Sequence, residues 1–387
     1  MFIEENSKNR VIIVTTDILG LSHDISEEVA RRIMNNHGID RSQLLLNSSH
    51  THSGPVIWPA LSVIFDFNPE DQKAAMRYAE KLTGDIVEVV NMAFAAMEPV
   101  QLSYGCGNAG FAVNRRQPTE KGVVIGINPD GPVDHDVPVL KTTDMNGNVK
   151  AILFGYTCHN TTSRSFLVNG DYAGFAQIEV EKYYPGAVAM YMAGCGADQN
   201  PSPRGTVELA AEHGKTLADA VKKAIESELK PVGPPVRTSY TVTELQFRPF
   251  DPEIYRKEMK EGDVYMQRRA KLMLEAYNKG WDMTSYKYPV QSVRFGKDFT
   301  ILALTGEVVI DYAIAAKKTF PRENLFVAGY CNEVQCYIPS KRIIKEGGYE
   351  PESSMIYYGF PGPFTDDVED KIMVAVAQVL KRTGAKR

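Results

Sequence analysis

The sequence predicts a single α/β domain with a central mixed β-sheet flanked by helices, and three observations support this. Apolar β-rich runs alternate with segments of helical periodicity, as in RVIIVTTD (10–17) followed by DISEEVARRIMNNHG (24–38). The 387 residues, 43% of them hydrophobic, suffice for one large core spanning 1–387. Polar residues capable of chemistry follow several apolar strands, which predicts a site at strand ends.

The first third of the chain reads as alternating strands and helices. Strands are expected over 10–17, 42–50 and 100–107, and helices over 24–38 and 71–98, with Ser26 as the N-cap of the first helix. The segment Asn114 to Val137 is rich in Pro, Gly and Asn and has little periodicity. It is therefore expected to be a long ordered loop, and such loops are often functional.

The remainder continues the alternation. Strands are expected over 150–159, 187–194, 299–307 and 324–332, and helices over 173–184, 207–229, 308–320 and 368–387. The charged segment 252–280 has helical periodicity and mixed signs, which favours a helical insertion or a lid.

The two ends of the chain resemble each other in layout. An acidic residue ends the first strand of each half (Asp17, Glu307), and a polar loop follows the second strand (50–55 and 332–340). Two interpretations remain open: an internal duplication with a site at the junction, or the common recurrence of β-α-β units.

Charge and hydropathy argue against several classes of function. The net charge of -5 offers no basic surplus for nucleic acid or for an anionic membrane surface. No run of about 18 apolar residues predicts a transmembrane segment. The charged N-terminus and only five cysteines favour a cytoplasmic protein, or an exported one if a signal peptide has been removed. The oligomeric state stays open.

Histidines at two strand ends suggest a metal site. His50 and His52 follow one apolar strand and His159 follows another, in a chain with only seven histidines. If the backbone stays extended, His50 and His52 point to the same side, so that one binds a metal and the other acts on the substrate. Glu307 is the best-placed carboxylate, and imidazole with carboxylate suits a catalytic zinc ion. Capping or surface histidines, and a glutamate at a helix N-terminus, are the alternatives.

Several motifs, in order along the chain, resemble the neutral/alkaline non-lysosomal ceramidase family. They are NSSHTHSGP (47–55), VNRRQP (113–118), TCHNTT (157–162), VNGDYAGFA (168–176), LTGE (304–307) and the segment 329–359, in which Tyr337 and Tyr349 stand twelve residues apart. HTHSGP is fairly specific by itself, and the ordered set is strongly so.

The resemblance implies a role for each matching position. His50, His159, Glu307 and Tyr349 would ligate Zn²⁺, and His52 would act as a base or carry a proton to the leaving amine. Arg115 and Tyr337 would bind the developing oxyanion. A zinc ion of this kind lowers the pKa of a bound water to about 7 and polarises a carbonyl.

The sequence departs from the family at two points. Where the family has a serine in GDxSPN, this chain reads GCGADQNPSPRG (194–205) and so has Asn200, or less readily Gln199, at that position. An amide is no nucleophile. The family also has a C-terminal β-sandwich domain, whereas a helix follows YYGFPGP here, so no such domain is expected.

The sequence therefore predicts a ceramidase-like zinc-dependent hydrolase that cleaves an amide or ester bond with metal-activated water. Its substrate would be a small molecule or a lipid-like amide, with a place in sphingolipid metabolism. One alternative is a hydrolase of a soluble substrate, such as a lactone, an acylated sugar or an N-acyl amine. The other is a non-catalytic zinc-containing binding protein, against which His52, Arg115 and Tyr337 speak.

Overall fold

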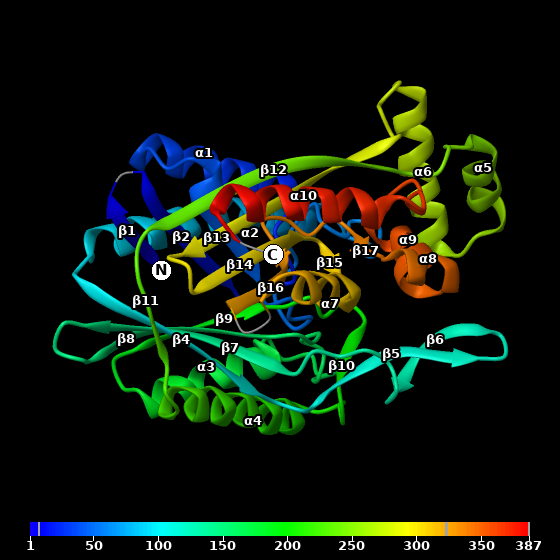
Figure 1. Cartoon of the computed structure of the whole chain (residues 1–387). Coiled ribbons are helices and arrows are strands. Elements are labelled where there is room, and N and C mark those ends of the chain that lie inside the picture. The colour runs from blue at the N-terminus through cyan, green and yellow to red at the C-terminus, as the bar shows by residue number, and fades with distance from the viewer. Residues whose placement is uncertain (7, 322–323, 386–387) are drawn as a thin grey trace.

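Two β-sheets lie face to face between outer helices, which gives the molecule four layers (Figure 1). The computed structural model describes residues 1–6, 8–321 and 324–385. The larger sheet has seven strands in the order β1-β2-β3-β16-β14-β13-β12, and the smaller has five in the order β11-β4-β7-β8-β9. Two short sheets, β10-β5-β6 and β15-β17, complete the strands.

The strands have the following bounds: β1 Phe2–Asn6, β2 Asn9–Thr16, β3 Leu44–Ser48, β4 Val100–Asn108, β5 Ala112–Thr119, β6 Gly122–Asn128, β7 Asp136–Asp144, β8 Val149–Tyr156, β9 Val188–Ala193, β10 Gln199–Pro201, β11 Lys230–Val232, β12 Val236–Gln246, β13 Ser285–Phe295, β14 Phe299–Thr305, β15 Glu307–Val308, β16 Leu325–Cys331 and β17 Tyr337–Ile338. The α-helices are α1 His23–His37, α2 Pro69–Ala95, α3 Asp171–Tyr183, α4 Val207–Glu226, α5 Pro252–Glu261, α6 Val264–Asn278, α7 Ile310–Thr319, α8 Lys341–Glu346, α9 Ser354–Tyr358 and α10 Val368–Thr383. A 3-10 turn, Arg41–Gln43, precedes β3, and a π-helical turn, Tyr349–Ser353, precedes α9.

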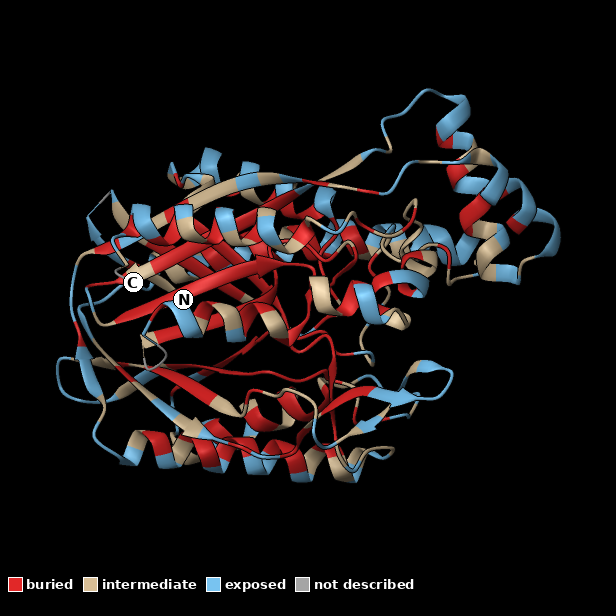
Figure 2. Cartoon of the chain, turned by 45° about the vertical axis from the view of Figure 1, so that its right-hand side comes forward, coloured by how far each residue is buried: buried red, intermediate tan, exposed pale blue. Residues whose placement is uncertain are grey.

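Four clusters of buried side chains fill the spaces between the layers. One joins the inner faces of the two sheets, where Leu45 and Phe326 of the larger sheet meet Leu153 and Met190 of the smaller. A second cluster lies between the smaller sheet and the helices α3 and α4. A third packs strands β2 and β3 against α1 and α2, and a fourth packs the larger sheet against α7 and α10. Figure 2 shows the central strands of both sheets as mostly buried, and the tip of the β5–β6 hairpin and the outer faces of α5 and α6 as exposed.

The predicted fold class is confirmed, because the larger sheet mixes parallel and antiparallel pairs and helices cover it. The second, five-stranded sheet was not foreseen as a separate layer. Periodicity identifies a strand but not the sheet it joins, since partner strands lie far apart in the chain.

Two local predictions were wrong. The N-cap of α1 is Ser22, whose side chain accepts a hydrogen bond from the backbone N–H of Ile25, whereas Ser26 is fully buried within the helix. The segment 114–137 is not a loop throughout, because β5 and β6 form a hairpin there. Most side chains of β6 are exposed or half-exposed, so this strand lacks the apolar alternation that reveals a half-buried strand.

The segment 252–280 forms two antiparallel helices, α5 and α6, between the long strands β12 and β13. Arg268 of α6 donates hydrogen bonds to the carbonyls of Val63 and Ile64, in the loop that follows His52. For the final helix, α10 ends at Thr383, and residues 386–387 of the predicted helix lie outside the described residues. Among the described helices, none has the length and apolarity needed to cross a bilayer.

The strand order bears on the resemblance between the two ends of the chain. β2 and β3 are parallel and connected through α1, and β14 and β16 are parallel and connected through α7. The two units meet where β3 and β16 pair antiparallel, so the order β2-β3-β16-β14 is palindromic. This arrangement fits a duplication, although β-α-β units are common in themselves.

Candidate metal centre

Three of the predicted metal ligands converge where the two sheets meet. Oε2 of Glu307 lies 3.1 Å from Nε2 of His50 and 3.0 Å from Nε2 of His159. His50 follows β3, Glu307 follows β14, and His159 follows β8 of the smaller sheet. All three side chains are almost completely buried. The expectation of a site at strand ends therefore holds for these three positions.

Backbone contacts set the tautomer of both buried histidines. Nδ1 of His50 lies 2.6 Å from the carbonyl oxygen of Leu19, and Nδ1 of His159 lies 2.8 Å from that of Gly196. A carbonyl oxygen only accepts, so each Nδ1 carries the proton and each Nε2 presents a lone pair. Burial, followed by the charge of Arg115, lowers the pKa of His159 to about 4. This ring is therefore neutral near pH 7, the form that binds a metal.

The Glu307 carboxylate supplies the test of whether a cation fits. Its Oε2 is buried and has no hydrogen-bond partner, although two imidazole lone pairs face it. A buried negative oxygen opposite two lone pairs is unfavourable unless a cation lies among them. Two neutral imidazole nitrogens together with one carboxylate oxygen are also a set of ligands that suits Zn²⁺. The residues present thus fit a divalent metal ion.

His52 is the exposed member of the histidine cluster. Ligand nitrogens of His50, His52 and His159 lie within 4.8 Å of one another, and Nε2 of His52 is 3.2 Å from Nε2 of His50. Within the described part of the chain, no hydrogen bond anchors its Nδ1 to a backbone carbonyl. His52 can therefore turn and exchange a proton with solvent more readily than the two anchored rings.

The backbone that brings His50 and His52 together differs from the expected one. His50 has φ of 62°, in the left-handed region, so the chain is not extended there. The rings nevertheless lie 4.8 Å apart between centroids. Tyr330, near the end of the partner strand β16, and Asn332, directly after that strand, also have positive φ. Such strained residues gather at functional sites, where the surrounding packing holds them in place.

Gly306 forms the turn that positions the side chain of Glu307. It has φ of +79°, and a Cβ at this position would lie 2.8 Å from the carbonyl oxygen of Cys336. Only glycine meets both demands without strain. The glycine of LTGE is thus required by the turn that ends β14 and directs Glu307 into the cluster.

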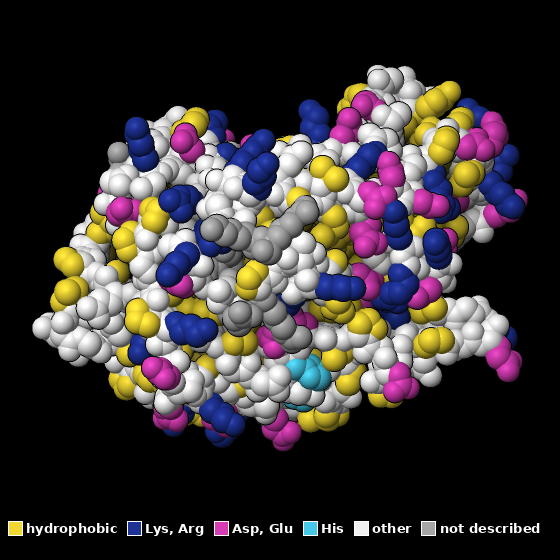
Figure 3. All heavy atoms as spheres, viewed as in Figure 1, with side chains coloured by type: hydrophobic (Ala, Val, Ile, Leu, Met, Phe, Trp, Pro, Cys, Tyr) yellow, Lys and Arg dark blue, Asp and Glu magenta, His cyan; other side chains and the backbone are white. Residues whose placement is uncertain are grey.

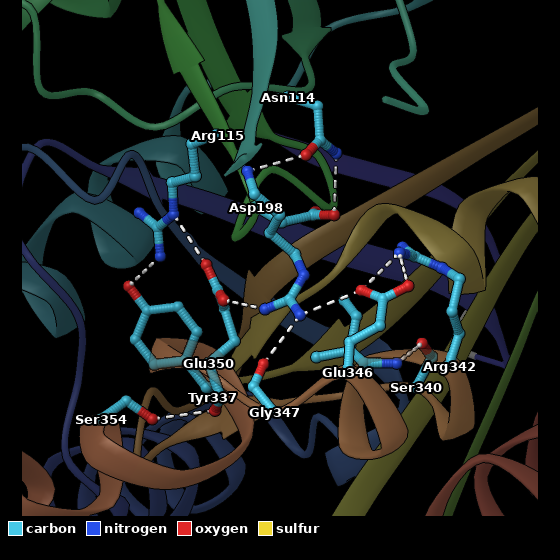
Figure 4. Close-up of polar contacts among 12 residues, drawn as sticks. Asn114, Arg115, Asp198, Tyr337, Ser340, Arg342, Glu346, Gly347, Glu350 and Ser354 are labelled. Carbon is cyan, nitrogen blue, oxygen red and sulfur yellow. Dashed lines mark hydrogen bonds and ion pairs between the residues drawn. The ribbon is translucent and has the colours of Figure 1, made fainter. Parts of the chain in front are cut away.

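Arg115 lies between Tyr337 and Glu350 and contacts both side chains (Figure 4). Arg115 Nη2 donates to the Tyr337 hydroxyl at 3.2 Å, and this hydroxyl is 3.3 Å from Nε2 of His159. Tyr349 packs its ring edge-on against that of Tyr337 at 5.3 Å, with the Arg115 guanidinium 5.5 Å from its ring centroid. The hydroxyl of Tyr337, rather than that of Tyr349, thus contacts a histidine of the cluster.

Two further residues support the site and were not identified from the sequence. Glu350 binds Nε of Arg115 at 2.9 Å and also pairs with Arg116, so it fixes the guanidinium beside Tyr337. Tyr358 donates a hydrogen bond to Oε1 of Glu307, leaving Oε2 to face the histidines. Both residues stand in the family-like segment 329–359, which was the available signal, but neither was given a role from the sequence.

Asn200 lies in β10, paired with Val113 of β5. Cross-strand partners share a face and side chains alternate along a strand, so Asn200, Val113 and Arg115 lie on the same face. Asn200 is 4% exposed, and its Oδ1 is buried without a partner. The side chain of Gln199 instead accepts a hydrogen bond from the backbone N–H of Asp134, in the loop before β7. Of the two amides, Asn200 is the one on the face of the site.

No family model matches the chain, but similar proteins are found. Neutral ceramidase B of Dictyostelium discoideum is 24% identical over 226 residues, which are 53% of this chain and 30% of that protein. The neutral ceramidase of Pseudomonas aeruginosa is 25% identical over 189 residues, which are 46% and 27% of the two chains. This chain therefore matches less than a third of the length of these curated relatives.

Solved structures agree over nearly the whole chain. The neutral ceramidase structure from Pseudomonas aeruginosa matches with a TM-score of 0.71 at 16% identity, covering 97% of this chain and 67% of that one. A structure titled ceramidase complexed with C2 matches with a TM-score of 0.73 at 16% identity, covering 99% and 69%. The comparisons confirm the resemblance inferred from the motifs and confirm the fold.

Proposed function

We propose that this chain, which is similar to neutral ceramidases in sequence over part of their length and in fold, is a metal-dependent hydrolase of ceramide-like amides. One observation carries the proposal: two imidazole lone pairs, fixed by backbone carbonyls, face a buried and unpartnered carboxylate oxygen. The metal we propose is Zn²⁺, held by His50, His159 and Glu307. When bound, it would lower the pKa of a water molecule and polarise the amide carbonyl.

For the fourth ligand, the contacts favour Tyr337 over Tyr349. The Tyr337 hydroxyl is already 3.3 Å from Nε2 of His159 and accepts a hydrogen bond from Arg115. Tyr349 lies beyond it, half-buried, with its ring against Tyr337. We therefore assign Tyr337 to the metal side of the site and Tyr349 to the substrate side, exchanging the roles that the resemblance implied.

The side chains have separate roles in the hydrolysis. His52 accepts a proton from the attacking water and returns it to the leaving amine, because it is the histidine open to solvent. Arg115, held by Glu350, donates to the oxygen on which charge develops in the transition state. Asn200 occupies the position of the family serine and offers its amide to the substrate. Since an amide does not attack a carbonyl, water is the nucleophile.

The proposed substrate class rests on the relatives and on the loop that follows His52. The relatives are named ceramidases, and the loop after His52 carries the half-exposed rings of Trp58, Phe65 and Phe67. Such rings suit an apolar chain attached to the amide. A soluble N-acyl amine or a lactone remains the second candidate, favoured by the amide of Asn200, which is more polar than an acyl chain requires.

The test is hydrolysis of a fluorescent short-chain ceramide beside soluble N-acyl amines, esters and lactones. The protein is stripped with a chelator and reloaded with Zn²⁺, and the His50→Ala variant is assayed under the same conditions. His37→Ala, which removes an imidazole outside the cluster, is the control. We expect ceramide turnover that requires the metal and is lost only in His50→Ala. Turnover that survives both metal removal and His50→Ala would refute the proposal.

A further inference from the structure

One loop beside the metal centre exposes three consecutive large hydrophobic side chains. Phe166 is 108% exposed, Leu167 65% and Val168 79%. Across the described residues, no other three consecutive large hydrophobic side chains are exposed. Single exposed hydrophobic residues are ordinary, but a contiguous apolar apex indicates a surface that binds something apolar. We call residues 163–168 the apolar loop.

Hydrogen bonds at its base hold the apolar loop in shape. The N–H of Ser163 donates to the Asp171 carboxylate at 2.8 Å, and the two hydroxyls of Ser163 and Ser165 are 3.0 Å apart. On the far side, Asn169 donates from its side chain to the carbonyl of Leu167 at 2.8 Å. The polar groups of the base are thus satisfied within the loop, and the apolar side chains are left pointing outward.

The base of the apolar loop is joined to the segment that carries His52. The N–H of Asn169 donates to the carbonyl of Ser53 at 3.1 Å, and the Thr51 hydroxyl donates to the carbonyl of Asn169 at 2.9 Å. The aromatic loop with Trp58, Phe65 and Phe67 begins at the same place. The exposed apex therefore stands at the rim of the metal centre and not on a remote face.

Two arginines flank the apex. Arg164 is exposed, and Arg204 is half-buried beside the loop, within hydrogen-bond reach of Thr161. An apolar apex with guanidinium groups at its base is the pattern of an interfacial anchor, because hydrocarbon enters the acyl region while the cations stay among phosphates. The face that carries α10, by contrast, shows side chains of both charges scattered over it (Figure 3).

We propose that the apolar loop docks into the surface of a lipid bilayer and brings the metal centre to substrates embedded there. This inference rests on the proposed function for its purpose, since ceramide-like amides are bilayer components, but the docking itself needs no catalysis. With a net charge of -5 on the chain, the attachment depends mainly on the three apolar side chains and is strengthened locally by the two arginines.

The experiment measures binding of the full chain to phosphatidylcholine vesicles by co-sedimentation, with and without added phosphatidylglycerol. The test variant combines Phe166→Ser, Leu167→Ser and Val168→Ser. These side chains are exposed, so their loss should leave the fold intact, as circular dichroism will verify. We expect vesicle binding to weaken at least about tenfold, since each buried apolar group adds to partitioning.

A control variant removes three exposed hydrophobic side chains elsewhere. Met145→Ser, Val188→Ser and Val374→Ser change residues that are 63%, 57% and 58% exposed. This variant should bind vesicles like the unmodified protein. A Phe166→Trp protein gives direct evidence, because its added fluorescence should be quenched by brominated lipid if the apex enters the bilayer.

The outcomes separate the possibilities. Equal binding of both triple variants, or no vesicle binding by the unmodified protein, would overturn the proposal. So would a concentration-dependent dimer that the apolar-loop variant abolishes, because a second copy would then be the occupant. Hydrolysis of a soluble short-chain amide should be unchanged in the loop variant, while hydrolysis of a vesicle-embedded amide falls. If binding behaves as expected but no amide is cleaved, the docking stands and the proposed function fails.

Discussion

Glu350→Gln should destabilise the protein by about 3 kcal/mol, because it breaks a buried pairing of one carboxylate with two guanidinium groups. Glu350, Arg115 and Arg116 are 1%, 5% and 3% exposed. Burial alone would raise the pKa of Glu350, but the charges of Arg115 and Arg116 hold it below the ordinary value. The carboxylate is therefore ionised at neutral pH and its charge is needed there.

The magnitude follows from the contacts that remain. Removing one partner of a buried ion pair costs about 3–5 kcal/mol. After the substitution, Arg116 keeps Glu346 at 3.0 Å and the carbonyl of Gly347 at 2.8 Å, and Arg115 keeps Tyr337 at 3.2 Å. These contacts place the expected loss at the lower end of the range.

The assay is urea denaturation at neutral pH, with kcat/KM measured in parallel. Glu346→Gln is the matched control, since it makes the same change opposite the same Arg116 but at a side chain that is 34% exposed, and it should cost less than about 1 kcal/mol. Glu350→Gln should also lower kcat/KM, because Arg115 loses the contact that holds it. Equal losses of stability in the two variants would refute this account of the network.

Four further predictions concern the site and its surroundings. Tyr358→Phe should weaken metal binding about tenfold in a chelator competition, because the cluster carboxylate loses its orienting hydrogen bond, whereas Tyr357→Phe should not. Zinc at one hundred times its dissociation constant should raise the free energy of unfolding by about 2.7 kcal/mol, and an unchanged denaturation midpoint would contradict the fit of the site. The hydrogen bond with Glu333 raises the pKa of His23. The stabilisation from this pair is therefore full below about pH 6.5 and is lost as the pH rises through the folded-state pKa of His23. His23→Gln should abolish this pH dependence of the unfolding free energy, which should amount to less than about 1 kcal/mol because the His23 side chain is 61% exposed. Asn200→Ala should retain measurable turnover with a raised KM, and complete loss would contradict water as the nucleophile.

The strand-end histidines could be predicted from sequence because their placement follows from local structure. His50, His159 and Glu307 each follow a continuous apolar run, and the ends of such runs are visible in the chain. That they meet at one point depends on two sheets packing face to face, which periodicity does not encode. The ordered family motifs supplied that information.

The tyrosines mark the limit of the sequence argument. Tyr337 and Tyr349 are separated by a short helix, two glycines with positive φ, and then a π-helical turn that begins at Tyr349, so no regular spacing relates their directions. The motif identified both residues, but the contact with His159 was needed to distinguish them. Glu350 and Tyr358 act through contacts that span many residues along the chain, which is why the sequence did not reveal them.

The position of the cluster explains why its geometry depends on the whole fold. His50 and Glu307 come from the two β-α-β units that meet at the β3–β16 pair, and His159 comes from the other sheet. A shift of one unit against the other, or of one sheet against the other, would separate side chains whose polar atoms now lie about 3 Å apart. The buried contacts between Leu45, Leu153 and their neighbours therefore hold the two histidines and the glutamate in register. For the same reason, substitutions in the core between the sheets should affect metal binding even where they touch no ligand.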